Sequence, residues 1–245
     1  MSSSKLIRLH VTAPLAAQAV ISASEDQAHY LLNVMRATPA SEVILFNGRD
    51  GAWRASVGVP AKRRVEFTVT AQTQLPRREP DLWLAFAPVK RIEFLAEKAS
   101  ELGVAALLPV FTRHTDVSRV NVQRLKANAT EAAEQCERLS VPDVHEPVTF
   151  DKLLAQWPSG RKLFVLDETG GGIPIASALR VAAAAPVGFL TGPEGGFAQT
   201  ELDALRQLPF VTAVGLGPRI LRAETAALAA LACWQALQGD WVAKA

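Results

Sequence analysis

The sequence has only two cysteines, Cys136 and Cys233, among its 245 residues. Neither stands in a CxxC motif or near a histidine at the spacing of metal ligands, so a disulfide framework and a metal site are not expected. No apolar run approaches the roughly 20 residues that span a bilayer, and the start of the chain lacks the apolar segment of a secretory signal. We therefore expect a cytoplasmic protein with no membrane partner and no metal.

Several common catalytic motifs are also missing. There is no GxxxxGK[ST] loop, no GxGxxG after a first strand and no GxSxG turn, which argues against the usual nucleotide-binding and serine-hydrolase sites. His114 and His145 stand in separate segments. The chemistry has to lie in some other pattern.

An excess of charge of one sign is missing overall, because the net charge is only +2. The charge is unevenly distributed, however. Residues 1–78 contain 10 Lys and Arg against 5 Asp and Glu, and residues 79–245 contain 16 against 19. A basic segment on a near-neutral body favours a partner with a phosphate backbone, and it is also typical of a solvated, mildly basic surface.

Two domains are expected, over residues 1–74 and 75–245. The first is predicted to be β-rich, with one helix from a Ser24 cap to about Arg36. In that helix Tyr30, Leu31, Val34 and Met35 form an apolar stripe. Strands are expected at 43–46, 53–59 and 65–69, and a polar linker at 72–80.

From residue 81 onward short apolar strands alternate with helical patterns. Strands are predicted at 82–87, 105–110, 162–167, 186–191 and 211–216. Helices are predicted at 90–102, 120–139, 150–157 (capped by Thr149), after a capping box at 200–203, and at 223–237. This alternation predicts an α/β fold with a mostly parallel sheet covered on both faces.

Two glycine-rich turns follow the last two predicted strands, LTGPEGGF at 190–197 and GLGPRILRAET at 215–225. The first alone also fits a tight turn at a helix entry. As a pair they predict a ligand site, because such loops line the crevice at the carboxyl ends of parallel strands. Glu194, Arg219 and Arg222 place charge at the same rim.

These two turns resemble the cofactor signature of SPOUT-class RNA methyltransferases, and more narrowly that of the ribosomal RNA small subunit methyltransferase E family. Other stretches agree with the resemblance: residues 7–9, 29–36, 93–103, 131–138 and 141–142. The resemblance implies an N-terminal PUA-like RNA-binding β-barrel and a SPOUT-type α/β domain with a trefoil knot. It also implies a homodimer, S-adenosylmethionine as cofactor, and methylation of N3 of a uridine, uridine 1498, in the 16S rRNA of the small ribosomal subunit.

Candidate residues follow from this resemblance. The cofactor-binding candidates are Leu190, Thr191, Gly192, Pro193, Gly195, Leu216, Gly217, Ile220, Leu221 and Thr225. The RNA-binding candidates are Arg8, Arg36, Arg49, Arg54, Arg63 and Arg64.

The catalytic candidates are Arg222, Glu194 and Arg219. Arg222 or Arg219 is expected to stabilise the developing uracil anion or to hold a flanking phosphate, and one of the two arginines can serve dimer pairing instead. Glu194 is expected to accept the N3 proton, the alternative being that it only satisfies backbone donors or pairs with an arginine.

Two other functions fit the same residues. One is a SPOUT methyltransferase that acts on transfer RNA or on a ribose 2′-OH, and the other is a non-catalytic RNA-binding factor for ribosome assembly. A cofactor titration separates the second from an enzyme.

Overall fold

The computed structural model describes residues 6–39, 41–61, 64–182 and 185–242. By the contacts between residues, the chain forms two compact units. Unit 1 contains the chain up to Arg78 together with Ala133–Val141, and unit 2 contains Glu79–Ala132 and the chain from Pro142 onward. The boundary after residue 74 stays a prediction, and the second segment of unit 1 was not expected from the sequence.

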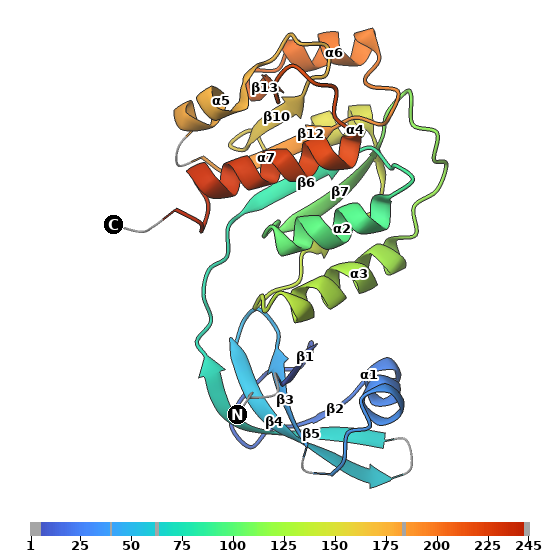
Figure 1. Ribbon diagram of the computed structural model, residues 1–245, viewed down its shortest axis with the longest axis vertical. Helices are drawn as coiled ribbons and strands as arrows, with labels where there is room; N and C mark the ends of the chain where they lie inside the picture. Colours follow the sequence, from blue (N-terminus) through green and yellow to red (C-terminus); the bar gives the residue numbers. More distant parts are fainter. Residues whose placement is uncertain (1–5, 40, 62–63, 183–184, 243–245) are drawn as a thin grey trace. The chain divides into compact units, whose positions relative to one another are not determined.

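Unit 1 is a five-stranded sheet with one helical segment (Figure 1). Its strands lie in the order β1-β3-β4-β5-β2, with β1 parallel to β3 and the other pairs antiparallel. The elements are β1 (Ile7–His10), β2 (Val20–Ser22), α1 (Glu25–His29), the π-helix η1 (Tyr30–Val34), β3 (Glu42–Phe46), β4 (Ala52–Ala61) and β5 (Arg64–Gln74). The predicted strands are confirmed, and β5 extends into the stretch that was expected to be linker.

The turn between β3 and β4 is held by side chains. Asn47 Oδ1 accepts from the backbone of Asp50 at 2.9 Å, and Asp50 Oδ2 accepts from Asn47 Nδ2 at 2.7 Å and from Leu15 N at 2.9 Å. The hydrogen bonds from Asn47 and Leu15 lower the pKa of the Asp50 carboxyl below its ordinary value. Gly51 has φ +79°, and a Cβ there would lie on the backbone of β5.

The helical segment of unit 1 begins at the predicted cap, and its apolar stripe is mostly exposed. Ser24 Oγ accepts from Gln27 N at 3.2 Å, which confirms the cap. Among the four stripe residues only Leu31 is buried, whereas Tyr30, Val34 and Met35 are exposed. The stripe is mostly exposed because the segment turns Ala28 and Leu31 into the core and ends as a π-helix.

Residues 133–141 complete a second small core in unit 1. Ala133 and Leu139 pack with Ile44, Phe46 and Ala52 of β3 and β4, and all five side chains are buried. A segment far along the sequence therefore contributes to the N-terminal unit.

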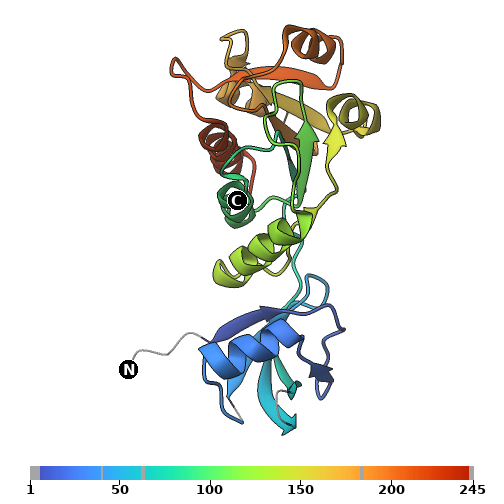
Figure 2. The same cartoon turned by 90° about the vertical axis from the view of Figure 1, so that its right-hand side faces the viewer.

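Unit 2 contains parallel strands with helices on both faces (Figure 2). The sheet order is β11-β13-β10-β12-β6-β7-β8, and β9 pairs with β7 off this path. The strands are β6 (Leu82–Phe86), β7 (Ala106–Phe111), β8 (Asp143–Val144), β9 (Val148–Thr149), β10 (Lys162–Leu166), β11 (Ile173–Pro174), β12 (Val187–Thr191) and β13 (Val211–Gly215). The helices are α2 (Ile92–Glu101), α3 (Val122–Gln135), α4 (Phe150–Gln156), α5 (Ile175–Val181), α6 (Gln199–Arg206) and α7 (Ala223–Leu237).

The two faces of this sheet are covered by different helices. Apolar side chains of α4 and α6, among them Leu153 and Leu202, share one core cluster with Leu163, Val165 and Leu190 of the strands. Helices α2 and α7 pack against each other, and Figure 2 shows them on the opposite side of the strands from α4. The predicted parallel sheet with two covered faces is confirmed.

The capping box predicted at 200–203 was wrong. Helix α6 begins one residue before Thr200, with Ala198 at the N-cap position. Glu201 Oε2 accepts from Ala198 N at 2.9 Å. This buried carboxylate makes the bond that the third helical residue makes in a capping box, whereas an alanine at the N-cap has no side chain to make the other bond.

An arginine ties together the amino ends of three strands of unit 2. The buried Arg161, just before β10, donates to the carbonyls of Asp81 and Val187 at 2.9 and 3.0 Å and to the Asp81 carboxylate at 2.6 Å. Its guanidinium carbon lies 3.8 Å from the centroid of the Trp83 ring. These contacts fix the edge of the sheet opposite to the signature loops.

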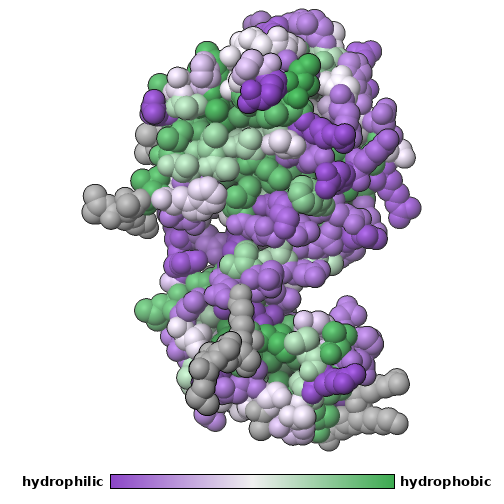
Figure 3. Space-filling model, viewed as in Figure 1, coloured by the Kyte–Doolittle hydropathy of each residue, from purple (hydrophilic) through white to green (hydrophobic). Residues whose placement is uncertain are grey.

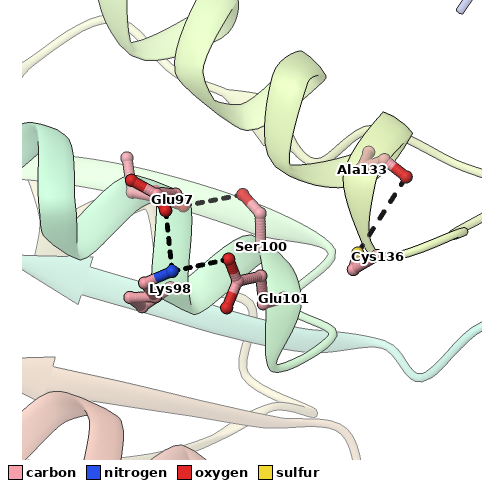
Figure 4. A network of polar contacts seen from close by, with 7 residues as sticks. Glu97, Lys98, Ser100, Glu101, Ala133 and Cys136 are labelled. Carbon is pink, nitrogen blue, oxygen red and sulfur yellow. Dashed lines mark hydrogen bonds and ion pairs between the residues drawn. The ribbon is translucent and has the colours of Figure 1, made fainter. Parts of the chain in front are cut away.

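The charged stretch of α2 is paired within its own helix. Lys98 Nζ donates to Glu97 Oε1 and Glu101 Oε1, both at 2.7 Å (Figure 4). The hydrogen bonds to Glu101 and Glu97 raise the pKa of the Lys98 ammonium. Ser100, fully buried, donates to Ala96 O at 2.7 Å. Glu93, at the start of the same helix, pairs instead with Arg124 of α3.

Candidate functional site

Three loops meet at the carboxyl edge of the sheet of unit 2. Strand β10 lies between β12 and β13, and all three run parallel. The loop after β10 therefore falls between the two signature loops that follow β12 and β13. This is the edge at which open α/β sheets bind ligands.

A cavity of about 740 Å³ lies between these loops. That volume is within the range of small-molecule sites, roughly 300–1,000 Å³. Its lining comes from three segments and the start of α7: Leu166–Gly170 with Gly172 and Pro174; Thr191–Glu194 with Gly196; and Val214–Ala223 with Ala226.

The cavity brings together most of the predicted site residues. The three catalytic candidates, Glu194, Arg219 and Arg222, line it and are exposed. The cofactor candidates that line it are Thr191, Gly192, Pro193, Leu216, Gly217, Ile220 and Leu221.

Three cofactor candidates do not line the cavity. Leu190 is fully buried in the core beneath α4 and α6, because it points to the other face of β12 from its neighbours. Gly195 faces the side chain of His114, with His114 Cβ 3.2 Å from the position of a Cβ on the glycine. Thr225 is exposed on α7, outside the lining.

The first signature loop is shaped by close packing around its glycines. A Cβ on Gly192 would lie 3.1 Å from the ring of Phe197, which is buried. Gly196 has φ +69°, and its amide donates to Pro193 O at 3.0 Å to close the turn. Because L side chains rarely adopt that φ, glycine is required at position 196.

A buried carboxylate fastens this loop to the loop after β7. Besides the bond to Ala198, Glu201 accepts from Arg113 N at 2.9 Å through its other oxygen. In the same loop His114 Nδ1 lies 3.1 Å from Gly195 O, a bond that places a proton on Nδ1. The His114 bond thus holds the GPEGGF turn itself, and the Glu201 bonds hold Ala198, the residue that follows the turn.

The second signature loop leads directly into α7. Arg222 occupies the N-cap position, and Thr191 Oγ1 donates to Ala223 O at 3.5 Å, linking the two signature loops. The next residue, Glu224, is buried, and its carboxylate lies 3.6 Å from Arg91 Nη1. Glu224 therefore has a structural role in the first turn of α7, where negative charge is favourable.

The loop after β10 was missed by the sequence analysis, although it forms one wall of the cavity. Asp167, which is buried, accepts from Thr169 N at 2.8 Å and from Thr169 Oγ1 at 2.6 Å, and its own amide donates to Val214 O. Glu168 is exposed and reaches over Gly196 of the first signature loop. The available signal was the position of this loop after a predicted parallel strand, since its residues match no motif.

The predicted RNA-binding arginines differ in exposure. Arg36, Arg49, Arg54 and Arg64 are exposed. Arg8 is buried: its guanidinium donates to Arg138 O at 2.9 Å and lies 5.0 Å from the ring centroid of Phe46. Arg63 lies outside the described residues.

Three of the exposed arginines also make contacts of their own in unit 1. Arg49 donates to Thr12 O at 2.9 Å. Arg54 and Arg64 each lie 3.6 Å from a carboxylate, of Glu42 and Glu66 respectively. Such exposed ion pairs contribute little to stability and remain open to exchange with a phosphate.

No group of three or more potential metal ligands occurs among residues 6–39, 41–61, 64–182 and 185–242. In the same part of the chain no helix has the length and apolar character needed to cross a membrane.

Comparison with known proteins places this geometry in a family. Residues 76–235 match the model of an RNA methyltransferase domain, and residues 24–70 match that of an RNA methyltransferase PUA domain. The ribosomal RNA small subunit methyltransferase E of Rickettsia conorii is 31% identical over 234 residues, which cover 93% of this chain and 94% of the relative. The protein of the same name from Synechocystis sp. is 32% identical over 236 residues, covering 94% and 77%.

A solved structure agrees over both units. The crystal structure of a ribosomal RNA small subunit methyltransferase E from Neisseria gonorrhoeae, bound to S-adenosyl methionine, matches with a TM-score of 0.85 and 28% identity. The match covers 97% of this chain and 100% of that one. The predicted α/β fold with a PUA-like N-terminal domain is confirmed, and the trefoil knot stays a prediction.

Proposed function

Since the chain belongs to the ribosomal RNA small subunit methyltransferase E family, we propose that it methylates 16S rRNA with S-adenosylmethionine as the methyl donor. The target that we propose is N3 of a single uridine, uridine 1498. The observation that carries the proposal is the cavity at the carboxyl edge of the sheet, which both signature loops line together with Glu194, Arg219 and Arg222.

The residues of this cavity fit S-adenosylmethionine. Glycine backbone at Gly192 and Gly217 permits close approach to an adenosine, and Leu216, Leu221 and Ala226 supply apolar wall. When bound, S-adenosylmethionine supplies an electrophilic methyl group on a sulfonium, and it leaves as the thioether.

The charged residues of the cavity suit methylation at a nitrogen that carries a proton. Uracil N3 becomes a good nucleophile as its proton leaves. Glu194 lines the cavity, and we propose it as the group that accepts this proton. The negative charge that develops on the uracil oxygens is stabilised by a guanidinium, for which Arg222 is our first choice and Arg219 our second. Both arginines are exposed at the cavity, so both can contact the substrate.

The PUA-like unit supplies affinity for RNA. Its exposed Arg36, Arg49, Arg54 and Arg64 suit contacts with phosphates, which position an RNA without reading its sequence. The target base has to leave its stack to reach the methyl group, as for other enzymes that modify nucleobases. Because Arg8 is buried, we propose for it a role in the structure of unit 1 instead of a phosphate contact.

The active protein that we propose is a cytoplasmic homodimer. Figure 3 shows a band of hydrophobic atoms over α7 on the face turned to the viewer. Leu237 at the end of this helix is 36% exposed, and Trp241 and Val242 after it are 58% and 41% exposed. An exposed apolar surface of this kind is typical of an interface between subunits.

The proposal is tested by binding and by product analysis. Isothermal titration with S-adenosylmethionine should give saturable binding, and incubation with small subunits from a strain that lacks the methyl group should yield N3-methyluridine in the 16S rRNA by nucleoside mass spectrometry. Binding of S-adenosylmethionine without methyl transfer would favour a non-catalytic assembly factor. Methylation of a transfer RNA or of a ribose would show that the substrate differs from the one that we propose.

The role of Arg222 is tested by R222A, with R219A as the matched variant. R222A should lower the rate of methyl transfer by about 10²–10³-fold, the usual effect of removing one stabilising donor. Its dissociation constant for S-adenosylmethionine should stay within about threefold, since the guanidinium acts on the uracil and not on the cofactor. Near-normal transfer by R222A together with a strong loss in R219A would exchange the two roles.

A further inference from the structure

The outer face of the helical segment α1–η1 carries three exposed apolar side chains within six residues. Tyr30, Val34 and Met35 are 40%, 59% and 44% exposed. The inner face of the same segment, with Ala28 and Leu31, belongs to the core of unit 1. The exposure is therefore a property of one face, and we name Tyr30, Val34 and Met35 the outer patch.

The backbone brings the outer patch together. Met35 N donates to Tyr30 O at 3.0 Å, the i to i+5 bond of a π-helix, so these two residues follow each other on the same face. Single π-turns are rare and occur frequently at functional sites. The next residue, Arg36, has φ +52°, a backbone conformation that is uncommon for residues other than glycine.

Arg36 places positive charge at the C-terminal end of the outer patch. It follows the patch directly and is exposed. The acidic residues of the segment, Glu25 and Asp26, lie in the first turn of α1, at the other end. Figure 2 shows this helical segment in front of the strands of unit 1, on the side turned to the viewer.

We propose that the outer patch stacks an unpaired nucleobase of the RNA substrate, with Tyr30 beneath the base and Arg36 on the adjoining phosphate. This inference rests on the proposed function, because it takes the partner to be RNA. An aromatic ring beside an apolar side chain is the surface on which single-stranded bases stack. A base inside a duplex cannot reach such a ring, so the patch selects an unpaired or extruded nucleotide. The adjacent arginine favours RNA over an apolar protein partner, because it supplies the charge that a phosphate complements.

The experiment measures the affinity of the full chain for a single-stranded RNA oligonucleotide and for an RNA duplex of equal length, without S-adenosylmethionine. Y30A should weaken binding of the single strand by at least about fivefold, the lower end of the loss of one stacked base. Y30F keeps the ring and should bind within twofold of the parent. L75A, which removes another exposed apolar side chain of unit 1 that is 74% exposed, is the matched control and should bind as the parent does.

Salt dependence separates stacking from charge. Y30A should leave the slope of the logarithm of the binding constant against the logarithm of the salt concentration unchanged. R36Q should make this slope less steep by the contribution of about one phosphate contact. Binding of S-adenosylmethionine should be the same in all variants, since the patch lies in unit 1 and the cofactor cavity in unit 2.

Several outcomes would overturn the inference. Equal binding of single-stranded RNA by Y30A and the parent would do so, and so would an equal loss for the duplex. A change of oligomeric state in Y30A would assign the patch to a protein interface. If the parent binds single-stranded RNA as described but transfers no methyl group, the proposed function fails while the stacking surface stands.

Discussion

The bonds made by Glu201 lead to a prediction about the cofactor loop. This buried carboxylate accepts from Arg113 N and from Ala198 N, one on each oxygen, both at 2.9 Å. In E201Q the amide oxygen keeps one of these donors, and the amide NH₂ group faces the other. One backbone N–H on the loop side is then left without an acceptor in a buried place.

The magnitude follows from these two contacts. A hydrogen bond to a charged group contributes about 1.5–3 kcal/mol, and a buried donor left unpaired costs about 1–3 kcal/mol. Because one of the two bonds is kept, we expect E201Q to lose about 2–3 kcal/mol of the free energy of unfolding. For a protein of this size that corresponds to a melting temperature lower by about 4–12 °C. The affinity for S-adenosylmethionine should fall about tenfold, since binding then has to order the GPEGGF turn.

Urea denaturation and isothermal titration measure the two effects. The matched control is D203N on the same helix, because Asp203 is 58% exposed and pairs with Arg206 at 3.1 Å. That pair is a surface contact, so D203N should change the free energy of unfolding by less than about 0.5 kcal/mol. If E201Q matched D203N in both stability and cofactor affinity, the idea that this carboxylate holds the loop would be refuted.

Three further predictions concern other parts of the structure. G172A should weaken cofactor binding at least about tenfold with the fold kept, because the new Cβ would stand 2.5 Å from the backbone of Val214; G160A, which meets nothing within 4 Å, should bind normally in the same titration. D50N should make stability depend less on pH in acid. Because the pKa of Asp50 is lowered in the folded protein, its carboxylate stabilises the fold above the unfolded pKa of about 3.9, and this stabilisation is lost as the pH falls through the folded pKa. Below about pH 4 the urea midpoint should therefore fall less steeply in D50N than in the parent, and parallel curves would contradict this. R161M should lose about 2–4 kcal/mol of the free energy of unfolding, since it leaves carbonyls at the amino ends of the strands without their buried donor, and a melting temperature equal to that of the parent would speak against it.

The longer strands and helices of unit 2 were predictable because each is a short apolar run or a long periodic one, whereas the short β8, β9, β11 and α5 were not predicted. The last helix was placed at 223–237, where the structure has it, since no glycine or proline interrupts its Ala/Leu pattern. The two signature loops were predictable as a site because glycine-rich turns follow adjacent parallel strands. The loop after β10 was not predictable from its residues, because only the order of the strands places it between the other two.

The outer patch shows a different limit. The sequence pattern reveals that Tyr30, Val34 and Met35 share a face, but not whether that face meets the core. Burial is decided by Ala28 and Leu31, which pack into unit 1 from the other side of the segment. The hydrogen bond that makes the π-turn involves only backbone atoms, so the residue types do not predict it.

The discontinuous make-up of unit 1 has a consequence for synthesis. A ribosome that has released only the first 74 residues has produced all the strands of the unit, yet Ile44, Phe46 and Ala52 still lack Ala133 and Leu139. The PUA-like unit therefore finishes folding only after Glu79–Ala132, about a third of the methyltransferase unit, has been synthesised. A fragment that ends after β5 would present that apolar face to solvent, where it invites aggregation or a chaperone. Production of the N-terminal unit alone thus calls for a linked copy of residues 133–141.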